Sequence, residues 1–140
     1  MLRGVLGAIV GIAVAVLTVI LFEWISHTIF PVPPELDTQD SAEMSAYMAS
    51  APLGALLLVL AGYLVATFDG TFVACWIGRA KPHVYALLIG VLMLVATVST
   101  LIMIPHPLWF SAAAFIGIII AAWAAFRVAP SAVQSRDRSE

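Results

Sequence analysis

The chain has 140 residues, of which 63% are hydrophobic and only 10% are charged, and its mean hydropathy is +1.09. Soluble globular domains are about half apolar and about a quarter charged, and a small domain buries only about two-thirds of the surface that its unfolded chain exposes. This composition therefore excludes an ordinary soluble domain. A net charge of −2 excludes a basic nucleic-acid-binding surface, and the single cysteine, Cys75, excludes a disulfide framework and a cysteine-built zinc site.

Four long apolar segments predict four transmembrane helices. Each is close to the roughly 20 residues that a helix needs to cross the hydrocarbon core, and none shows the polar alternation of barrel strands. The predicted fold is therefore all-α, an antiparallel four-helix membrane bundle that forms one domain over residues 1–128, with a disordered tail over 129–140. The predicted spans are residues 4–28, 53–78, 84–104 and 108–128.

The first apolar segment has a second interpretation, as a secretory signal peptide. Arg3 supplies a charged start, and the Ala-Val-Ala triplet at residues 13–15 resembles a cleavage site. A signal-peptide core is about 7–15 residues long, whereas the apolar sequence here continues to Phe22. The segment is therefore predicted to be a retained anchor.

All lysines and arginines fall on one side of the predicted bundle. The six cations are Arg3, Arg79, Lys81, Arg127, Arg136 and Arg138. The loop over residues 29–52, on the other side, carries four acids and no Lys or Arg. Because short cytoplasmic loops are enriched in Lys and Arg, both termini are predicted to be cytoplasmic and the acidic loop to lie outside.

The outer loop is predicted to contain a short helix. A proline-rich stretch over residues 31–34 favours an extended path, and Asp40, Ser41 and Glu43 then form a capping-box pattern. An apolar stripe at helical spacing follows, formed by Met44, Tyr47, Met48 and Ala51. This amphipathic helix lies on the outer surface, either packed on the rim of the bundle or acting as a lid over a site.

Small residues recur at every fourth position on three of the predicted spans. They are Gly7, Gly11 and Ala15; then Gly62, Ala66, Gly70, Ala74 and Gly78; then Ala113, Gly117, Ala121 and Ala125. Helices in lipid associate through close van der Waals contact, which small residues permit. The second span, with the longest series, is predicted to be the central packing helix. The series could serve packing within one bundle or self-association.

Three ionisable residues are predicted to converge near the outer boundary. Glu23 lies about 28 Å beyond Gly4 at 1.5 Å per residue, and His27 follows one turn later on the same face. His106, in the turn between the last two spans, is at the same level. Carboxylate and imidazole ligands suit zinc and other divalent metals, so the cluster is either a metal or proton site or a structural hydrogen-bonded pair of Glu23 with His27. Haem is not expected, because His106 lies between two prolines.

Asp69 is the ionisable residue predicted to lie deepest in the membrane. It is about 24 Å beyond Leu53, in the inner half of the second span, and adjoins Gly70 of the small-residue series. An intramembrane carboxylate is expected to face the bundle rather than lipid. Two roles remain open for Asp69: transfer of a proton or cation, and a structural polar contact.

Several short motifs together resemble a family of small four-helix bacterial inner-membrane proteins of uncharacterised activity. They are the Glu23-Trp-Ile-Ser-His27 segment, the Pro-Val-Pro-Pro loop at 31–34, Ala46-Tyr47-Met48, Pro52-Leu-Gly54-Ala and the Ile104-Pro-His-Pro-Leu-Trp109 turn. The resemblance implies a four-span bundle in the inner membrane and brings no catalytic role. The chain is also similar in size and span count to small multidrug-resistance transporters. Those proteins carry a glutamate deep in the first span, whereas Glu23 lies near its outer end.

No catalytic residues are predicted, because the sequence has no Ser/His/Asp set, no HExxH motif and no phosphate-binding loop. The leading hypothesis is a non-enzymatic accessory or structural membrane protein. Its predicted partners are the lipid bilayer and a membrane protein or a second copy, with no cofactor other than a divalent metal at the outer cluster. The alternative hypothesis is a small transporter or ion-handling protein that uses Glu23, His27 and His106, with Asp69.

Overall fold

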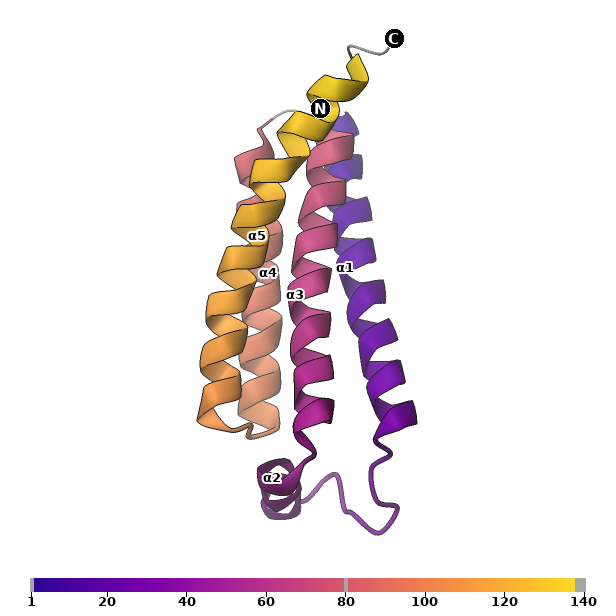
Figure 1. The fold of residues 1–140 in the computed structure, drawn as a ribbon, viewed down its shortest axis with the longest axis vertical. Helices are drawn as coiled ribbons and strands as arrows, with labels where there is room; N and C mark the ends of the chain where they lie inside the picture. Colours follow the sequence, from indigo (N-terminus) through magenta and orange to yellow (C-terminus); the bar gives the residue numbers. More distant parts are fainter. Residues whose placement is uncertain (1, 80, 138–140) are drawn as a thin grey trace.

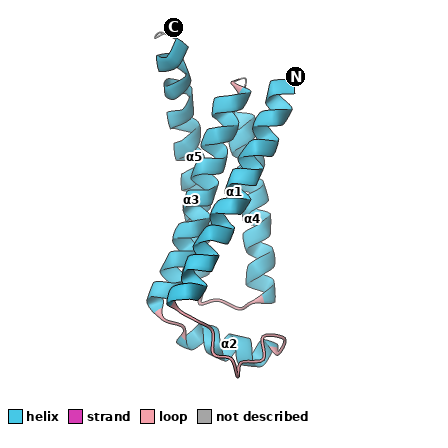
Figure 2. Ribbon diagram, turned by 90° about the vertical axis from the view of Figure 1, so that its right-hand side faces the viewer, coloured by secondary structure: helices cyan, strands magenta, loops and turns pink. Residues whose placement is uncertain are grey.

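The computed structural model describes residues 2–79 and 81–137, and over these residues the chain is helical with no strand. Four long helices run antiparallel, and a short helix lies across one end of the bundle (Figures 1 and 2). The helices are α1 (Leu2–Ile29), α2 (Ser41–Ser50), α3 (Leu53–Gly78), α4 (Pro82–Met103) and α5 (Leu108–Asp137). The predicted all-α fold is confirmed.

The four long helices are each long and apolar enough to cross a membrane. Only 17% to 39% of the most apolar window of each helix is buried inside the bundle, so most of the Leu, Ile and Val side chains face outward. The interior is instead rich in alanine and glycine. Large apolar residues outside and small residues inside are typical of a bundle whose solvent is lipid.

α3 is the central helix. It packs against α1, α5 and α4, whereas α1 contacts mainly α3. The whole small-residue series of α3, from Gly62 to Gly78, is buried. The part of this series from Gly70 to Gly78 lies against the small residues of α1, so that Gly7 is beside Ala74 and Gly78, and Gly11 is beside Gly70.

No side chain fits between α1 and α3 at their closest approach. A Cβ atom added to Gly11 would lie 2.5 Å from the carbonyl oxygen of Gly70 and 2.6 Å from the Cβ of Ala74. A Cβ atom added to Gly70 would lie 2.7 Å from the carbonyl oxygen of Gly11. The two glycines therefore allow backbone-to-backbone contact, which maximises van der Waals attraction where lipid provides no hydrophobic driving force.

The series on α5 packs less evenly than the sequence predicts. Ala121 and Ala125 are buried, but Ala113 and Gly117 are only half-buried. The most buried face of α5 also includes larger residues, with Phe110 and Ile118 fully enclosed. α5 thus meets α3 and α4 through mixed packing rather than through small residues alone.

The ends of the long helices lie within two residues of the predicted spans, except at the end of α5. α4 begins at Pro82, because proline is favoured in the first turn of a helix, where no backbone N–H is required. α5 continues to Asp137, although the tail from residue 129 is predicted to be disordered. Pro130 removes one backbone hydrogen bond but does not end the helix, so the predicted boundary at the membrane surface is not a helix boundary. Residues 138–140 of the predicted tail lie outside the described residues.

α2 begins with the predicted type of cap. The Asp40 side chain accepts hydrogen bonds from the backbone N–H groups of Ala42, at 2.8 Å, and Glu43, at 3.5 Å. Glu43 does not accept from the N–H of the cap residue Asp40, as in a capping box, but from the N–H of Asp37, three residues earlier, at 3.0 Å. Met44 is buried, and Met48 packs on the core formed by α3 and α5.

The contact between α1 and α3 predicts a strong effect of Gly11→Leu. The new side chain has no space beside Gly70, and overpacking of this kind costs typically about 1–3 kcal/mol. We expect the free energy of unfolding in detergent to fall by that amount. The matched control is Ala13→Leu on the exposed face of α1. Equal stability of the two variants would contradict this packing.

Candidate functional site

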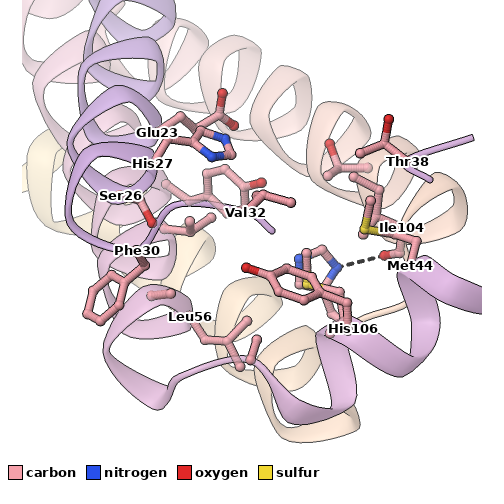
Figure 3. Close-up of a pocket in the computed structure, with 17 residues that line it drawn as sticks. Glu23, Ser26, His27, Phe30, Val32, Thr38, Met44, Leu56, Ile104 and His106 are labelled. Carbon is pink, nitrogen blue, oxygen red and sulfur yellow. Dashed lines mark hydrogen bonds between the residues drawn. The ribbon is translucent and has the colours of Figure 1, made fainter. Parts of the chain in front are cut away.

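α2 covers a cavity at its end of the bundle. The cavity has a volume of about 390 Å³ and is lined by residues from α1, the 30–38 loop, α2, α3, the end of α4 and the turn before α5 (Figure 3). Pockets that hold small molecules have volumes of about 300–1,000 Å³. We call this space the α2 cavity. It is large enough for a small organic ligand.

The structure places all three residues of the predicted outer cluster on the wall of the α2 cavity. Glu23 and His27 project from α1 on one side, and His106 lies on another side, in the turn that follows α4 (Figure 3). Glu23 is half-buried and His27 is exposed. The end of α1 and this turn lie at the same end of the bundle, as predicted, and the three side chains line a common space.

The three side chains share a cavity but do not form a bonded cluster. Within the described part of the chain, no three His, Cys, Asp or Glu side chains are close enough together to hold a metal ion. No hydrogen bond or ion pair joins Glu23 to His27 in the structure, so the predicted structural pair is not formed. The metal site thus stays a prediction.

His106 is held in a defined orientation. Its Nδ1 lies 2.6 Å from the backbone carbonyl oxygen of Ile104, drawn as the dashed line in Figure 3. A carbonyl oxygen can only accept, so Nδ1 carries a hydrogen and, in the neutral ring, Nε2 keeps its lone pair. The ring also stacks on Phe110, with centroids 4.7 Å apart. The ring of His106 is therefore held in place, and in its neutral form Nε2 is available as a hydrogen-bond acceptor.

Tyr63 and Phe110 belong to this site although the sequence did not single them out. Phe110 is fully buried and contacts Tyr63 edge-on, with ring centroids 6.4 Å apart. Tyr63 also lines the α2 cavity, together with Thr100 and Glu23. The available signal was that Tyr63 and Thr100 are polar residues in apolar spans, near the same end as Glu23.

The charge around the α2 cavity is negative. Glu23 is its one carboxylate, and no Lys or Arg is among the residues that line it. Four more acids lie in the loop before α2 and in the first turn of α2: Glu35, Asp37, Asp40 and Glu43. The described cations lie at the opposite end of the bundle, at the start of α1, between α3 and α4, and late in α5 (Figure 1). A ligand in the cavity therefore experiences a field that favours positive charge.

Asp69 lies between α1 and α3, away from the α2 cavity. Its Oδ2 accepts a hydrogen bond of 2.7 Å from the Thr18 hydroxyl of α1, and its Oδ1 is buried without a hydrogen-bond partner. The prediction that Asp69 faces the bundle agrees with this contact. The partner Thr18 was missed, because finding it requires the register of α1 against α3 rather than the sequence of either helix.

These features define a helical, multi-pass type of membrane protein with a polar-lined cavity at one end and a hydrogen-bonded carboxylate between two spans. Comparison with models of known protein families, with curated proteins and with solved structures finds no match.

The bond between Thr18 and Asp69 predicts energetic coupling between the two residues. Hydrogen bonds between transmembrane helices contribute about 0.6 kcal/mol on average and up to about 1.7 kcal/mol. We expect a double-mutant cycle of Thr18→Val and Asp69→Ala to give a coupling within that range when the free energy of unfolding is measured in detergent. Strictly additive single effects would show that the bond does not stabilise the fold.

Proposed function

We propose that this chain is a non-enzymatic protein of the bacterial inner membrane that binds a small ligand from the outer side in the α2 cavity. The observation that carries the proposal is the cavity itself, which gathers a carboxylate, two imidazoles, two tyrosines and three serine or threonine side chains within a mainly apolar wall. An apolar space with a few placed polar groups is the usual form of a small-molecule site. This proposal favours the solute- or ion-handling hypothesis over a purely structural role.

A purely structural role accounts less well for the residues of the cavity. Structural polar groups within a membrane bundle are expected to satisfy one another, because an unpaired polar group in a low-dielectric site costs free energy. The bond between Thr18 and Asp69 is of that kind. Glu23, by contrast, forms no hydrogen bond or ion pair in the described part of the chain. Its carboxylate is available to a ligand.

The contact between α1 and α3 also bears on self-association. The small residues of α1 that could form an intermolecular interface, Gly7, Gly11 and Ala15, are buried against α3. They serve packing within one chain, so this series provides no support for a dimer. An accessory role with a partner membrane protein stays a prediction without a specific contact surface.

The proposed orientation places α2 outside and both termini in the cytoplasm. It is supported by the separation of charge between the two ends of the bundle, since cytoplasmic loops are enriched in Lys and Arg. In this orientation the α2 cavity faces the exterior. Labelling of introduced cysteines from either side of the membrane decides the orientation.

A cavity-filling variant tests the proposed function. Val59 lines the cavity and Val65 faces outward on the same helix, so Val59→Trp fills the site and Val65→Trp is the matched control. We expect solutes from a panel of cations, neutral molecules and anions to include stabilisers of the wild type, measured by thermal unfolding in detergent. A ligand at 100 times its Kd stabilises by about 2.7 kcal/mol.

The expected pattern is stabilisation of the wild type and of Val65→Trp, and none of Val59→Trp. The proposal fails if no solute of any class stabilises the wild type. It also fails if Val59→Trp, folded in the absence of ligand, responds to ligand as strongly as the control.

A further inference from the structure

We infer that the ligand of the α2 cavity is an organic ammonium ion with an apolar body and no anionic group. This inference rests on the proposed function and specifies the ligand class. The juxtaposition that carries it is a carboxylate without a hydrogen bond or ion pair among the described residues, Glu23, in one cavity with tyrosine and methionine side chains.

The sign of the ligand's charge follows from Glu23. The side chain is half-buried and forms no hydrogen bond or ion pair within the described residues. Transfer of a carboxylate from water to a less polar site is unfavourable unless a partner compensates. No Lys or Arg is among the described residues that line the cavity, so these residues supply no side chain with a permanent positive charge there. A cationic ligand would provide the missing partner.

The apolar body of the ligand follows from the rest of the wall. Tyr63 from α3 and Tyr47 from α2 supply two aromatic rings, whose faces attract ammonium groups. Met44 and Met48 from α2 supply flexible, polarisable thioethers that adapt to irregular apolar shapes. A ligand that combines positive charge with apolar surface can use both kinds of contact.

The size and geometry of the cavity favour an organic cation over a metal ion. A volume of about 390 Å³ is in the range of small-molecule pockets, and a bare divalent ion would leave nearly all of it unfilled. In the described part of the chain, three metal-binding side chains do not come together. His106 also keeps only one nitrogen, Nε2, available, because Nδ1 donates to Ile104.

The same charges disfavour ligands that carry a phosphate, including phospholipid headgroups. Phosphate recognition relies on Arg and Lys side chains or on free backbone N–H groups at a helix N-terminus. No Arg or Lys lines the cavity, and the start of α2 is already capped by Asp40. The acids of the 35–43 loop would repel a phosphate next to them.

Four soluble probes separate charge from shape. Choline and 3,3-dimethylbutan-1-ol have nearly the same shape but differ in charge, and benzyltrimethylammonium adds an apolar ring to choline's head group. Phenylmethanesulfonate has a similar aromatic ring and carries a negative charge. Binding is measured by isothermal titration calorimetry on the full chain in detergent. We expect benzyltrimethylammonium to bind more tightly than choline, and neither the neutral alcohol nor the sulfonate to bind.

The Glu23→Gln variant tests the carboxylate, with Glu35→Gln, an exposed acid outside the cavity, as the matched control. Loss of one partner of a desolvated charge pair costs about 2–5 kcal/mol, so Glu23→Gln should weaken benzyltrimethylammonium at least about tenfold while the control leaves its Kd unchanged. If Glu23→Gln does not fold, Glu23→Asp keeps the charge and should retain binding. Tyr47→Phe should likewise retain affinity, whereas Tyr47→Leu should weaken it.

Distinct outcomes overturn this inference and the proposed function. Equal binding of choline and the neutral alcohol, tight binding of Zn²⁺ alone in place of the ammonium probes, or displacement of the probe by phosphatidylethanolamine would overturn the ligand class. In each of these cases loss of binding in Val59→Trp would leave the proposed function standing. If no probe or solute binds in the cavity, the proposed function itself fails.

Discussion

The backbone contact between α1 and α3 is the constraint on which the rest of the structure depends. Gly11 and Gly70 meet without room for a Cβ atom, and this contact fixes the distance and the register of the two helices. In lipid, where apolar side chains gain nothing by leaving solvent, such close contact is a main source of helix association. The register then brings Thr18 beside Asp69 and, farther along, Phe22 beside Gly62.

The same contact positions one wall of the α2 cavity. Once Phe22 packs beside Gly62, the next residues of the two helices, Glu23 and Tyr63, lie at the same depth and line one cavity. Phe110, from the start of α5, contacts the rings of both Tyr63 and His106. The packing of Phe22 on Gly62 and of Phe110 on its neighbours thus fixes the positions of Glu23, Tyr63 and His106.

Two half-buried carboxylates have different surroundings in the bundle. Asp69 receives a hydrogen bond from Thr18 between two packed helices, which satisfies one oxygen and ties the spans together. Glu23 lines a space large enough for a ligand and receives no hydrogen bond or ion pair from the residues that the structure describes. The first arrangement contributes to assembly, and the second leaves a charge available for recognition. This contrast is the basis for placing function at the α2 end and stability at the centre.

The spans were predictable from sequence because the bilayer fixes helix length and requires every backbone group to be satisfied within a helix. The convergence of Glu23, His27 and His106 followed from their depth alone. Thr18 and Phe110 did not follow, because each depends on which face of one helix meets another. The Thr18 hydroxyl reaches Asp69 through the directions of both side chains, which setting Gly11 against Gly70 does not by itself give. The helical continuation of α5 past Pro130 was also missed, because composition there predicts only polarity.

The central claim, that the α2 cavity opens to the exterior and holds a cation, is tested most directly by labelling a cysteine at its edge. Thr38 is exposed and lines the cavity, and Cys75 is buried, so Thr38→Cys in a Cys75→Ala background offers one reactive thiol. In right-side-out membrane vesicles, a membrane-impermeant thiol reagent should label this residue, and benzyltrimethylammonium should slow the labelling. Labelling only from the cytoplasmic side, or a rate that the cation leaves unchanged, would contradict the account.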